Sequence, residues 1–366
     1  MPDEHRIRAA VCRAFGRPPA VEEVVLDPPG PDEVRVRVLA CAVFRSDVDY
    51  MDGAWGGRLP AVFGHEAAGV VVEAGEGVDG PAQGTPVVIT LVRACGHCRL
   101  CAAGEPALCE TRFRLDARSP LRAPGGARIA QGLRTAAFAD EVVVHRSQAV
   151  PVPAGVPAER ACLLGCAVAT GFGAVENVAR VRAGSGVVVI GVGGVGLASV
   201  QAAALAGAAP LIAVDQARGR LGAALGLGAT DAIDAASDVE SLVRERTGGG
   251  ADHVIVATGA ASAIERGVRL LRRGGTLVAV GMPPSGAVAR IDPSALAHDG
   301  LRILGSKLGG TRPAVDLPRL AGLYLDGLLD QDALVSGRHP LERIGDALAA
   351  ARRGEGVRAI VVPDAP

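Results

Sequence analysis

Short apolar stretches bounded by proline and glycine mark the first 150 residues of the chain. Residues 34–38 alternate Val and Arg with a period of two, as in a strand that buries one face. Similar apolar runs occupy residues 70–73, 86–90 and 141–144, each beside turn-forming residues. The pattern predicts a β-rich first domain with long connections.

The pattern changes near Pro157. Apolar runs at residues 186–190, 211–214, 253–257 and 276–280 alternate with Ala-rich stretches of helical character. Continuously apolar strands separated by helices are typical of a parallel sheet that is covered on both faces. This half of the chain therefore predicts a doubly wound α/β domain.

The domain organisation follows from these two patterns. We expect a β-rich domain at residues 1–167, a doubly wound α/β domain at 168–305, and a tail at 306–366 that ends in an apolar strand and returns to the first domain. Residues 114–135, which are rich in Arg, Pro and Gly, are expected to form an exposed insertion.

Charge and composition exclude several classes of partner. The formal net charge is −1, so nothing favours binding to nucleic acid or to a membrane surface. The most apolar stretch, residues 187–209, is interrupted by glycines and does not predict a membrane span. The N-terminus lacks the sections of a signal peptide, so we expect a cytoplasmic protein that acts on a small-molecule substrate.

A cluster of four cysteines carries the first chemical signal. Cys95, Cys98, Cys101 and Cys109 have a spacing that can surround one tetrahedral metal ion. In a chain without an export signal, clustered CxxC spacing favours reduced thiols on metal over disulfides. Four thiolates leave no open position for substrate, so the sequence predicts a structural zinc site.

A glycine-rich turn carries the second signal. Gly191, Gly193, Gly194, Val195 and Gly196 follow an apolar strand and begin an Ala-rich helix, the context that a dinucleotide pyrophosphate requires. Asp215 ends the next strand, where its carboxylate can bind the hydroxyls of the adenine ribose. Its charge favours NAD(H) over NADP(H), and the nearby Arg218 and Arg220 moderate that preference.

The order of these features resembles the zinc-type medium-chain alcohol dehydrogenases. The shared features are the β-rich lobe, Gly64-His65-Glu66, the cysteine loop, Gly165-Cys166, the glycine turn and Asp215. The tail, with residues 305–310, 316–318 and 324–327, is most similar to the branch of thiol-dependent formaldehyde dehydrogenases. The resemblance implies a GroES-like catalytic domain, a Rossmann domain, and a homodimer or homotetramer.

The resemblance also implies a catalytic zinc, which in that family is held by a Cys, a His and a second Cys. His65 and Cys166 match the last two ligands, and Glu66 matches the adjacent acidic residue. The position of the first Cys is taken by Phe44, whose ring has no lone pair to donate and needs volume. A second zinc held by His65, Glu66, Cys166 and water stays an open alternative to a site without metal.

Other positions match the family's functional residues. Ser46 matches the hydroxyl that takes the substrate proton, Asp47 the carboxylate that orients the metal-ligating His, and Asp49 the place of a relay His. The remaining positions match residues that contact the cofactor in that family. Arg45 and Arg358 match contacts to its phosphates, and Thr170 and Val195 match residues that pack around the nicotinamide ring. Arg220 is expected to lie beside the ribose.

Three functions follow from this reasoning. The first is an NAD(H)-dependent alcohol or aldehyde oxidoreductase with a degraded catalytic zinc site. The second is a zinc-independent reductase of a conjugated C=C bond or an iminium ion. The third is a non-catalytic NAD-binding protein that keeps the structural zinc. The zinc content separates the first two, and the absence of any hydride transfer would identify the third.

Overall fold

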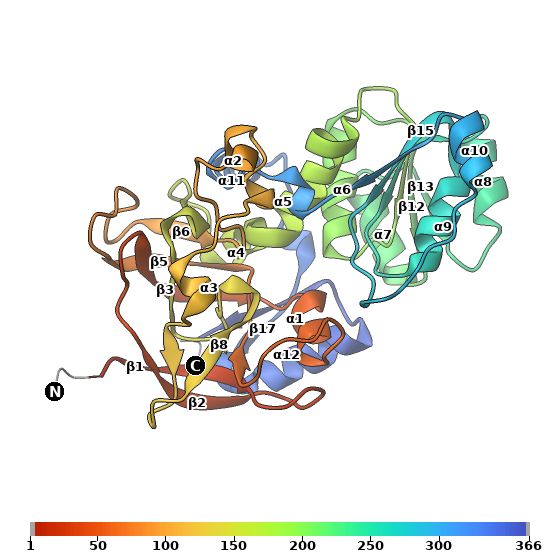
Figure 1. The fold of residues 1–366 in the computed structure, drawn as a ribbon. Helices are drawn as coiled ribbons and strands as arrows, with labels where there is room; N and C mark the ends of the chain where they lie inside the picture. The colour runs from red at the N-terminus through yellow and green to blue at the C-terminus, as the bar shows by residue number, and fades with distance from the viewer. Residues whose placement is uncertain (1–3, 364–366) are drawn as a thin grey trace. The chain divides into compact units, whose positions relative to one another are not determined.

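The computed structural model describes residues 4–363 of the 366-residue chain. The chain forms two compact units, Met1–Cys166 together with Arg312–Pro366, and Ala167–Thr311 (Figure 1). The last segment of the chain, drawn in violet-blue, lies with the red and orange strands of the first unit. The segment from Arg312 onward therefore belongs to the same compact unit as the β-rich half.

The first unit contains a closed barrel and a seven-stranded sheet. The barrel order is β1 (Arg6–Cys12), β2 (Ala20–Leu26), β7 (Leu121–Arg122), β8 (Arg128–Gln131) and β4 (Ala61–Val62). The sheet order is β10 (Ala149–Pro151), β6 (Pro86–Ile89), β5 (Ala67–Ala74), β3 (Glu33–Ala42), β18 (Arg358–Val362) and β17 (Val335–Pro340), with β9 (Glu141–His145) also paired to β3.

Strand β3 is the centre of this sheet. Val34, Val36 and Val38 are buried, whereas Arg37 between them is exposed, so the period-two pattern marks a real buried face. The C-terminal strand β18 pairs antiparallel with β3 through Ile360 and Ala42. This pairing fixes the chain's last strand beside the segment that leads into Phe44.

Residues 114–135 are not an exposed insertion, and that expectation is wrong. They contribute β7 and β8 to the barrel, and Leu115, Leu121 and Ile129 belong to the buried core. Their Arg and Gly content reflects ion pairs and turns: Arg122 and Arg128, for example, both contact Asp27. Composition was misleading because the two strands are too short to show a periodicity.

The helices of the first unit are mostly short and connect its strands. They are α1 (Arg45–Met51), α2 (Arg99–Ala102), α3 (Arg114–Ala117), α4 (Ala158–Leu163), α11 (Pro313–Leu325) and α12 (Ile344–Arg353). Single 3₁₀ turns lie at Pro106–Leu108, Gly132–Arg134, Arg146–Gln148, Asp332–Leu334 and Leu341–Arg343.

The second unit is a parallel six-stranded sheet with helices between its strands. The order is β13 (Asp231–Asp234), β12 (Leu211–Asp215), β11 (Val187–Ile190), β14 (Ala251–Val256), β15 (Leu271–Ala279) and β16 (Arg302–Gly305). The helices are α5 (Ala169–Gly173), α6 (Gly194–Leu205), α7 (Arg218–Gly226), α8 (Val239–Thr247), α9 (Ala261–Arg269) and α10 (Pro293–His298), with a 3₁₀ turn at Leu308–Gly310. This is the doubly wound fold that the sequence predicts.

One described helix, Ala158–Ala179, is long and apolar enough to pass a membrane-span test, but 83% of its apolar window is buried inside the protein. It comprises α4, α5 and two π-helical stretches, Leu164–Val168 and Ala174–Ala179. Burial of that extent is the behaviour of a core helix. Cys166 lies in the first π-helical stretch, a local irregularity that is frequent at functional sites.

Candidate active site

The candidate active site begins with Asp47, the third residue of α1. One carboxylate oxygen of Asp47 accepts a hydrogen bond from the backbone N–H of Phe44 at 3.0 Å, which caps the start of the helix. The other oxygen lies 3.0 Å from the Gly64 N–H and 3.0 Å from His65 Nδ1. Asp47 is fully buried, so one carboxylate joins the helix start to the His65 segment.

The backbone before His65 is also constrained. Gly64 has a φ of +92°, and an added Cβ would come within 2.6 Å of the Phe138 backbone nitrogen. Only glycine avoids both the strained conformation and the clash. Gly64 is therefore required by the local fold, and the next residue, His65, reaches Asp47.

His65 connects Asp47 with two further polar groups. Because Nδ1 faces the Asp47 carboxylate, Nε2 faces Ser46 Oγ at 3.4 Å, and the Cys166 side chain also hydrogen-bonds the ring. Burial lowers the pKa of His65, but the charge and hydrogen bonding of Asp47 outweigh it, and the pKa stands well above the usual value. Asp47, His65 and Ser46 thus form a continuous hydrogen-bonded chain.

Phe44 lies against this chain and against a cation. Its ring centroid is 5.3 Å from that of His65, and the Cζ of Arg358 lies 4.3 Å from the Phe44 centroid. Arg358 Nε is 3.4 Å from Glu66 Oε2, and both side chains are buried. The guanidinium is therefore held between a carboxylate and an aromatic face, which attracts a cation through its quadrupole.

These contacts do not fit a catalytic zinc. Among residues 4–363, the four loop cysteines are the one group of three or more His, Cys, Asp or Glu whose ligand atoms come together. The Glu66 carboxylate is instead within ion-pair distance of Arg358, and the Phe44 ring adjoins His65. Of the three ligand positions that the resemblance implies, only His65 and Cys166 bring metal-binding side chains together here, which is fewer than catalytic sites supply.

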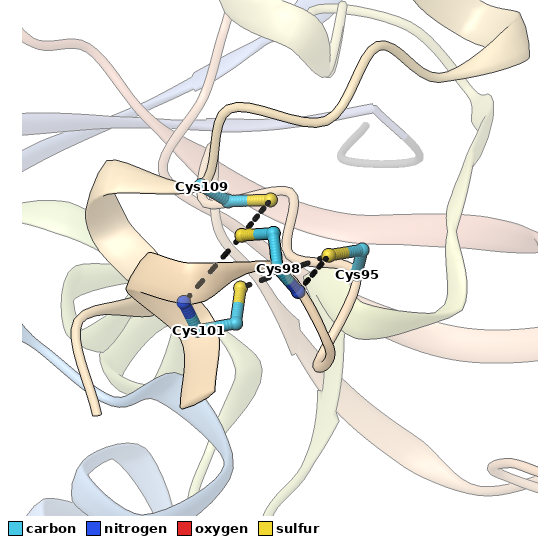
Figure 2. A group of neighbouring side chains, drawn as sticks. All are labelled: Cys95, Cys98, Cys101 and Cys109. Carbon is cyan, nitrogen blue, oxygen red and sulfur yellow. Dashed lines mark hydrogen bonds between the residues drawn. The ribbon is translucent and has the colours of Figure 1, made fainter. Parts of the chain in front are cut away.

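The cysteine loop does fit a structural zinc (Figure 2). The sulfurs of Cys95, Cys98, Cys101 and Cys109 all lie within 4.8 Å of one another. The Cys95–Cys101 and Cys98–Cys109 sulfur pairs are each 3.9 Å apart. A tetrahedron with Zn–S bonds of about 2.3 Å has edges of about 3.8 Å, so the four thiols are positioned for the ion.

Polar groups around the loop favour the thiolate form of Cys95 and Cys98, whereas burial raises the pKa of the Cys101 thiol. The backbone N–H groups of Cys98 and Cys101 point at the sulfurs of Cys95 and Cys98, at 3.2 and 3.5 Å. A hydrogen bond from the Thr111 side chain lowers the pKa of the Cys95 thiol to about 5. Thr111 escaped the sequence reasoning, because a lone Thr after a metal loop carries no spacing signal.

The nucleotide turn has the shape that a pyrophosphate needs. Gly191 has a φ of +86°, and a Cβ on Gly196 would lie 2.0 Å from the Gly191 carbonyl oxygen. A Cβ on Gly193 would meet no protein atom within 4 Å, so the backbone there is open to a ligand. The turn ends in α6, whose first N–H groups are available for an anion.

Asp215 lies at the end of β12, beside this turn. Its carboxylate accepts hydrogen bonds from the backbone N–H groups of Val192 and Ala217, at 2.8 and 2.9 Å. The Val192 contact joins the acid directly to the glycine turn. These residues fit a dinucleotide, with the carboxylate fixed next to the pyrophosphate cradle.

The other cofactor positions are also placed. Gly171, next to Thr170, packs closely on α6: a Cβ added to it would lie 2.5 Å from the Val195 carbonyl oxygen. Arg220 lies on α7, after Asp215. Arg45 is exposed and its Nε donates to Asp49 at 2.8 Å. The contact of Arg358 with Phe44 escaped the sequence reasoning, since nothing in either segment signals the other.

Family models match both halves of the chain. Residues 30–154 match the alcohol dehydrogenase GroES-like domain, and residues 194–321 match the zinc-binding dehydrogenase domain. The NDMA-dependent alcohol dehydrogenase of Amycolatopsis methanolica is 32% identical over 98% of this chain and 100% of its own. The chain therefore belongs to the zinc-type medium-chain alcohol dehydrogenase family.

Solved structures of similar proteins cover almost the whole chain. An alcohol dehydrogenase zinc-binding domain protein from Burkholderia ambifaria has a TM-score of 0.94 and 38% identity, over 98% of this chain and 99% of its own. Benzyl alcohol dehydrogenase from Acinetobacter calcoaceticus has a TM-score of 0.91 and 31% identity, with the same shares covered. A zinc-binding dehydrogenase from Sinorhizobium meliloti, bound to NADP, has a TM-score of 0.81 and 31% identity, over 98% of this chain and 100% of its own.

Proposed function

We propose that the chain is an NAD(H)-dependent oxidoreductase that interconverts an alcohol and an aldehyde or ketone without a catalytic zinc. The observation that carries the proposal is the contact of the Phe44 ring with His65, at a position that the sequence resemblance assigns to a metal-binding thiolate. The intact Asp47–His65–Ser46 chain supports retained chemistry at this site. The family membership supports hydride transfer as the reaction type.

The chain's own residues handle the proton. When bound, the nicotinamide supplies or accepts a hydride. Ser46 Oγ takes the substrate hydroxyl proton in oxidation and returns it to the carbonyl oxygen in reduction. His65 Nε2, 3.4 Å from that oxygen, supplies the proton to Ser46 in reduction, which suits its raised pKa, and Asp47 orients the imidazole through Nδ1.

Without a Lewis acid, the substrate has to be easier to oxidise or reduce than a simple alkanol. A metal ion contributes several kcal/mol by stabilising charge on the substrate oxygen. His65 contacts Asp47 and Glu66 contacts Arg358, so each of the two side chains has a protein partner in place of a metal ion. This arrangement also supports a second candidate function, a reductase of a conjugated C=C bond.

We also propose that NAD(H) is preferred over NADP(H), because the Asp215 carboxylate would repel a 2′-phosphate. Asp215→Ala is expected to weaken NADH binding by about 10- to 100-fold, the cost of a charged hydrogen bond, and to affect NADPH much less. Calorimetric titration of both cofactors measures this. Asp234→Ala, which removes a similar backbone contact on β13, is the control. Equal losses for both cofactors would remove Asp215 as the ribose ligand.

Restoring the thiolate tests the proposed zinc-free centre. Phe44→Cys is expected to raise the zinc content from one to two ions per chain, because the new thiolate joins His65 and Cys166. Inductively coupled plasma mass spectrometry of the purified protein measures the zinc content. The control is Phe44→Leu, which removes the ring but adds no ligand and should keep one zinc ion per chain. A Phe44→Cys protein with one zinc would show that Phe44 is not at the metal position.

Turnover tests the activity itself. The wild-type protein, with one zinc per chain, is expected to oxidise NADH in the presence of a reactive carbonyl and to keep its rate after brief treatment with a chelator that removes exposed zinc. Binding of NADH without oxidation by any carbonyl or enone would support the non-catalytic alternative instead.

A further inference from the structure

Cys166 differs from the other cysteines that lie outside the metal loop. The thiols of Cys12, Cys41 and Cys162 each donate a hydrogen bond to a backbone carbonyl, at 3.5, 3.8 and 3.4 Å, and these residues have no exposed surface. Cys166 is instead hydrogen-bonded to the His65 ring, and 6% of its surface is exposed. Three of the four thiols therefore fill space as small buried hydrophobes, whereas Cys166 has a basic partner and an accessible surface.

The His65 ring has the orientation that a general base for Cys166 requires. His65 Nδ1 lies 3.0 Å from Asp47 Oδ1, so Nε2 is the nitrogen left for the Cys166 thiol and for Ser46 Oγ. A nucleophile, an imidazole and an orienting carboxylate, joined in this order, form the constellation that activates Cys or Ser for covalent catalysis. This constellation is recognised by its geometry, because the order of its members along the chain differs between folds.

Two features of the helix place the Cys166 thiol at this ring. A Cβ on Gly165 would lie 2.5 Å from the Ile89 carbonyl oxygen, so only glycine lets the helix approach β6 this closely. Cys166 itself lies in the π-helical stretch Leu164–Val168, and such a departure from α-helical geometry is frequent at functional sites. The thiol is therefore presented by a locally shaped segment of the helix.

We propose that Cys166 is a covalent nucleophile, with which the protein oxidises an aldehyde to a carboxylic acid as a further activity. This rests on the proposed function, because hydride transfer is required and because a zinc ion bound to Cys166 would occupy the sulfur that has to react. The Phe44 ring lies 5.3 Å from the His65 ring, at the position where the resemblance implies a metal-binding thiolate. The pair of Cys166 and His65 is thereby left to act on the substrate.

The reaction balances over three steps. The Cys166 sulfur bonds to the aldehyde carbon, the C=O π bond breaks, and the thiol proton passes through His65 Nε2 and Ser46 Oγ to the oxygen, which gives a hemithioacetal. Its C–H bond then breaks, the hydride with both electrons passes to the oxidised nicotinamide, and the hydroxyl proton leaves through Ser46, which gives a thioester. Water attacks the thioester carbon, the C–S bond breaks, and His65 returns a proton to the sulfur as the carboxylic acid leaves.

The first test needs no cofactor and is independent of hydride transfer. The wild-type protein, with its structural zinc, is mixed with p-nitrophenyl acetate and quenched in acid, and peptide mass spectrometry locates the acetyl group. We expect it on Cys166, with a burst of about one nitrophenolate per chain ahead of slower turnover. Cys166→Ala should lose the burst. An acetyl group on Ser46, or none on Cys166, overturns the inference.

Two further variants separate a nucleophile from a thiol that is merely present. His65→Gln is expected to slow the acetylation of Cys166 by about 100- to 10,000-fold, the effect of losing a positioned base. Cys162→Ala is the control, because it removes a thiol one turn earlier on the same helix that bonds only a backbone carbonyl. It is expected to keep the burst. Acetylation at the wild-type rate in His65→Gln would contradict the role of the pair.

The second test uses benzaldehyde, which has no enolisable C–H bond. With NAD⁺ the wild-type protein is expected to form benzoate, and Cys166→Ala to form it at least about 100-fold more slowly, whereas Cys162→Ala should match the wild type. Equal benzoate formation in wild type and Cys166→Ala overturns the inference. Reduction of benzaldehyde by NADH without any benzoate from NAD⁺ also overturns it and leaves the proposed function standing. Absence of hydride transfer in both directions overturns the proposed function, and acetylation then decides whether Cys166 is a nucleophile.

Discussion

Ser46→Ala is expected to lower kcat by about 100- to 10,000-fold, the range typical of losing a positioned proton-transfer group. Ser46 Oγ is the one atom that links the substrate oxygen to His65 in the proposed path, 3.4 Å from Nε2. The dissociation constant of NADH should stay unchanged, because the hydroxyl acts on the substrate. Steady-state kinetics with a reactive alcohol, together with a fluorescence titration of NADH, measures both quantities.

Ser46→Thr is the matched control for this prediction. It keeps a hydroxyl at the same position of α1 and is expected to retain most of the turnover, whereas alanine is not. A Ser46→Ala protein with wild-type turnover would show that the substrate proton leaves by another route. A rise in the NADH dissociation constant in the alanine variant would instead assign Ser46 to cofactor binding.

Cys101→Ser is expected to remove the structural zinc and to lower the free energy of unfolding by several kcal/mol. The four sulfurs surround one point, and a Zn–thiolate site contributes its binding energy to folding. Zinc content should fall by one ion per chain, and the midpoint of urea denaturation should fall with it. The mutation removes a ligand from a closed site, so no other side chain of the set can replace it.

His97→Ala controls for disturbance of the same loop. His97 is exposed, and its Nδ1 lies 2.9 Å from the Cys95 carbonyl oxygen. The His97→Ala protein is expected to keep its zinc content and its free energy of unfolding. A Cys101→Ser protein that keeps one zinc at the loop, with unchanged denaturation, would show that the four cysteines do not form the metal site.

Much of the fold can be predicted because its signals are local. The period-two Val pattern marks β3, and the four apolar runs after Pro157 mark the strands β11, β12, β14 and β15 of the parallel sheet. The cysteine spacing and the glycine turn are also local, since each depends on residues a few positions apart. Both predicted sets come together in the structure.

The contacts around Phe44 could not be predicted in this way. Arg358 reaches the Phe44 ring because β18 pairs with the end of β3, a contact between segments more than three hundred residues apart. Neither segment carries a motif for the other. The sequence resemblance predicts a missing metal ligand at Phe44, but only the fold shows that a guanidinium and the His65 ring flank this side chain.

The buried Glu66 illustrates the same limit. Beside His65 in the sequence, it is a reasonable candidate for a metal ligand. In the structure Glu66 Oε2 lies 3.4 Å from Arg358 Nε. The charge of Glu66 is therefore compensated by a side chain from the C-terminal strand. A buried carboxylate has to be paired with a positive charge. In this fold the Arg358 guanidinium provides that charge in place of a metal ion.

Anomalous scattering at the zinc edge, from crystals of the wild-type protein, tests the central claim most directly. We expect one peak per chain, surrounded by Cys95, Cys98, Cys101 and Cys109, and none near His65. A second, fully occupied peak between His65 and Cys166, with the Phe44 ring turned away, would contradict the account and make the protein a two-zinc alcohol dehydrogenase.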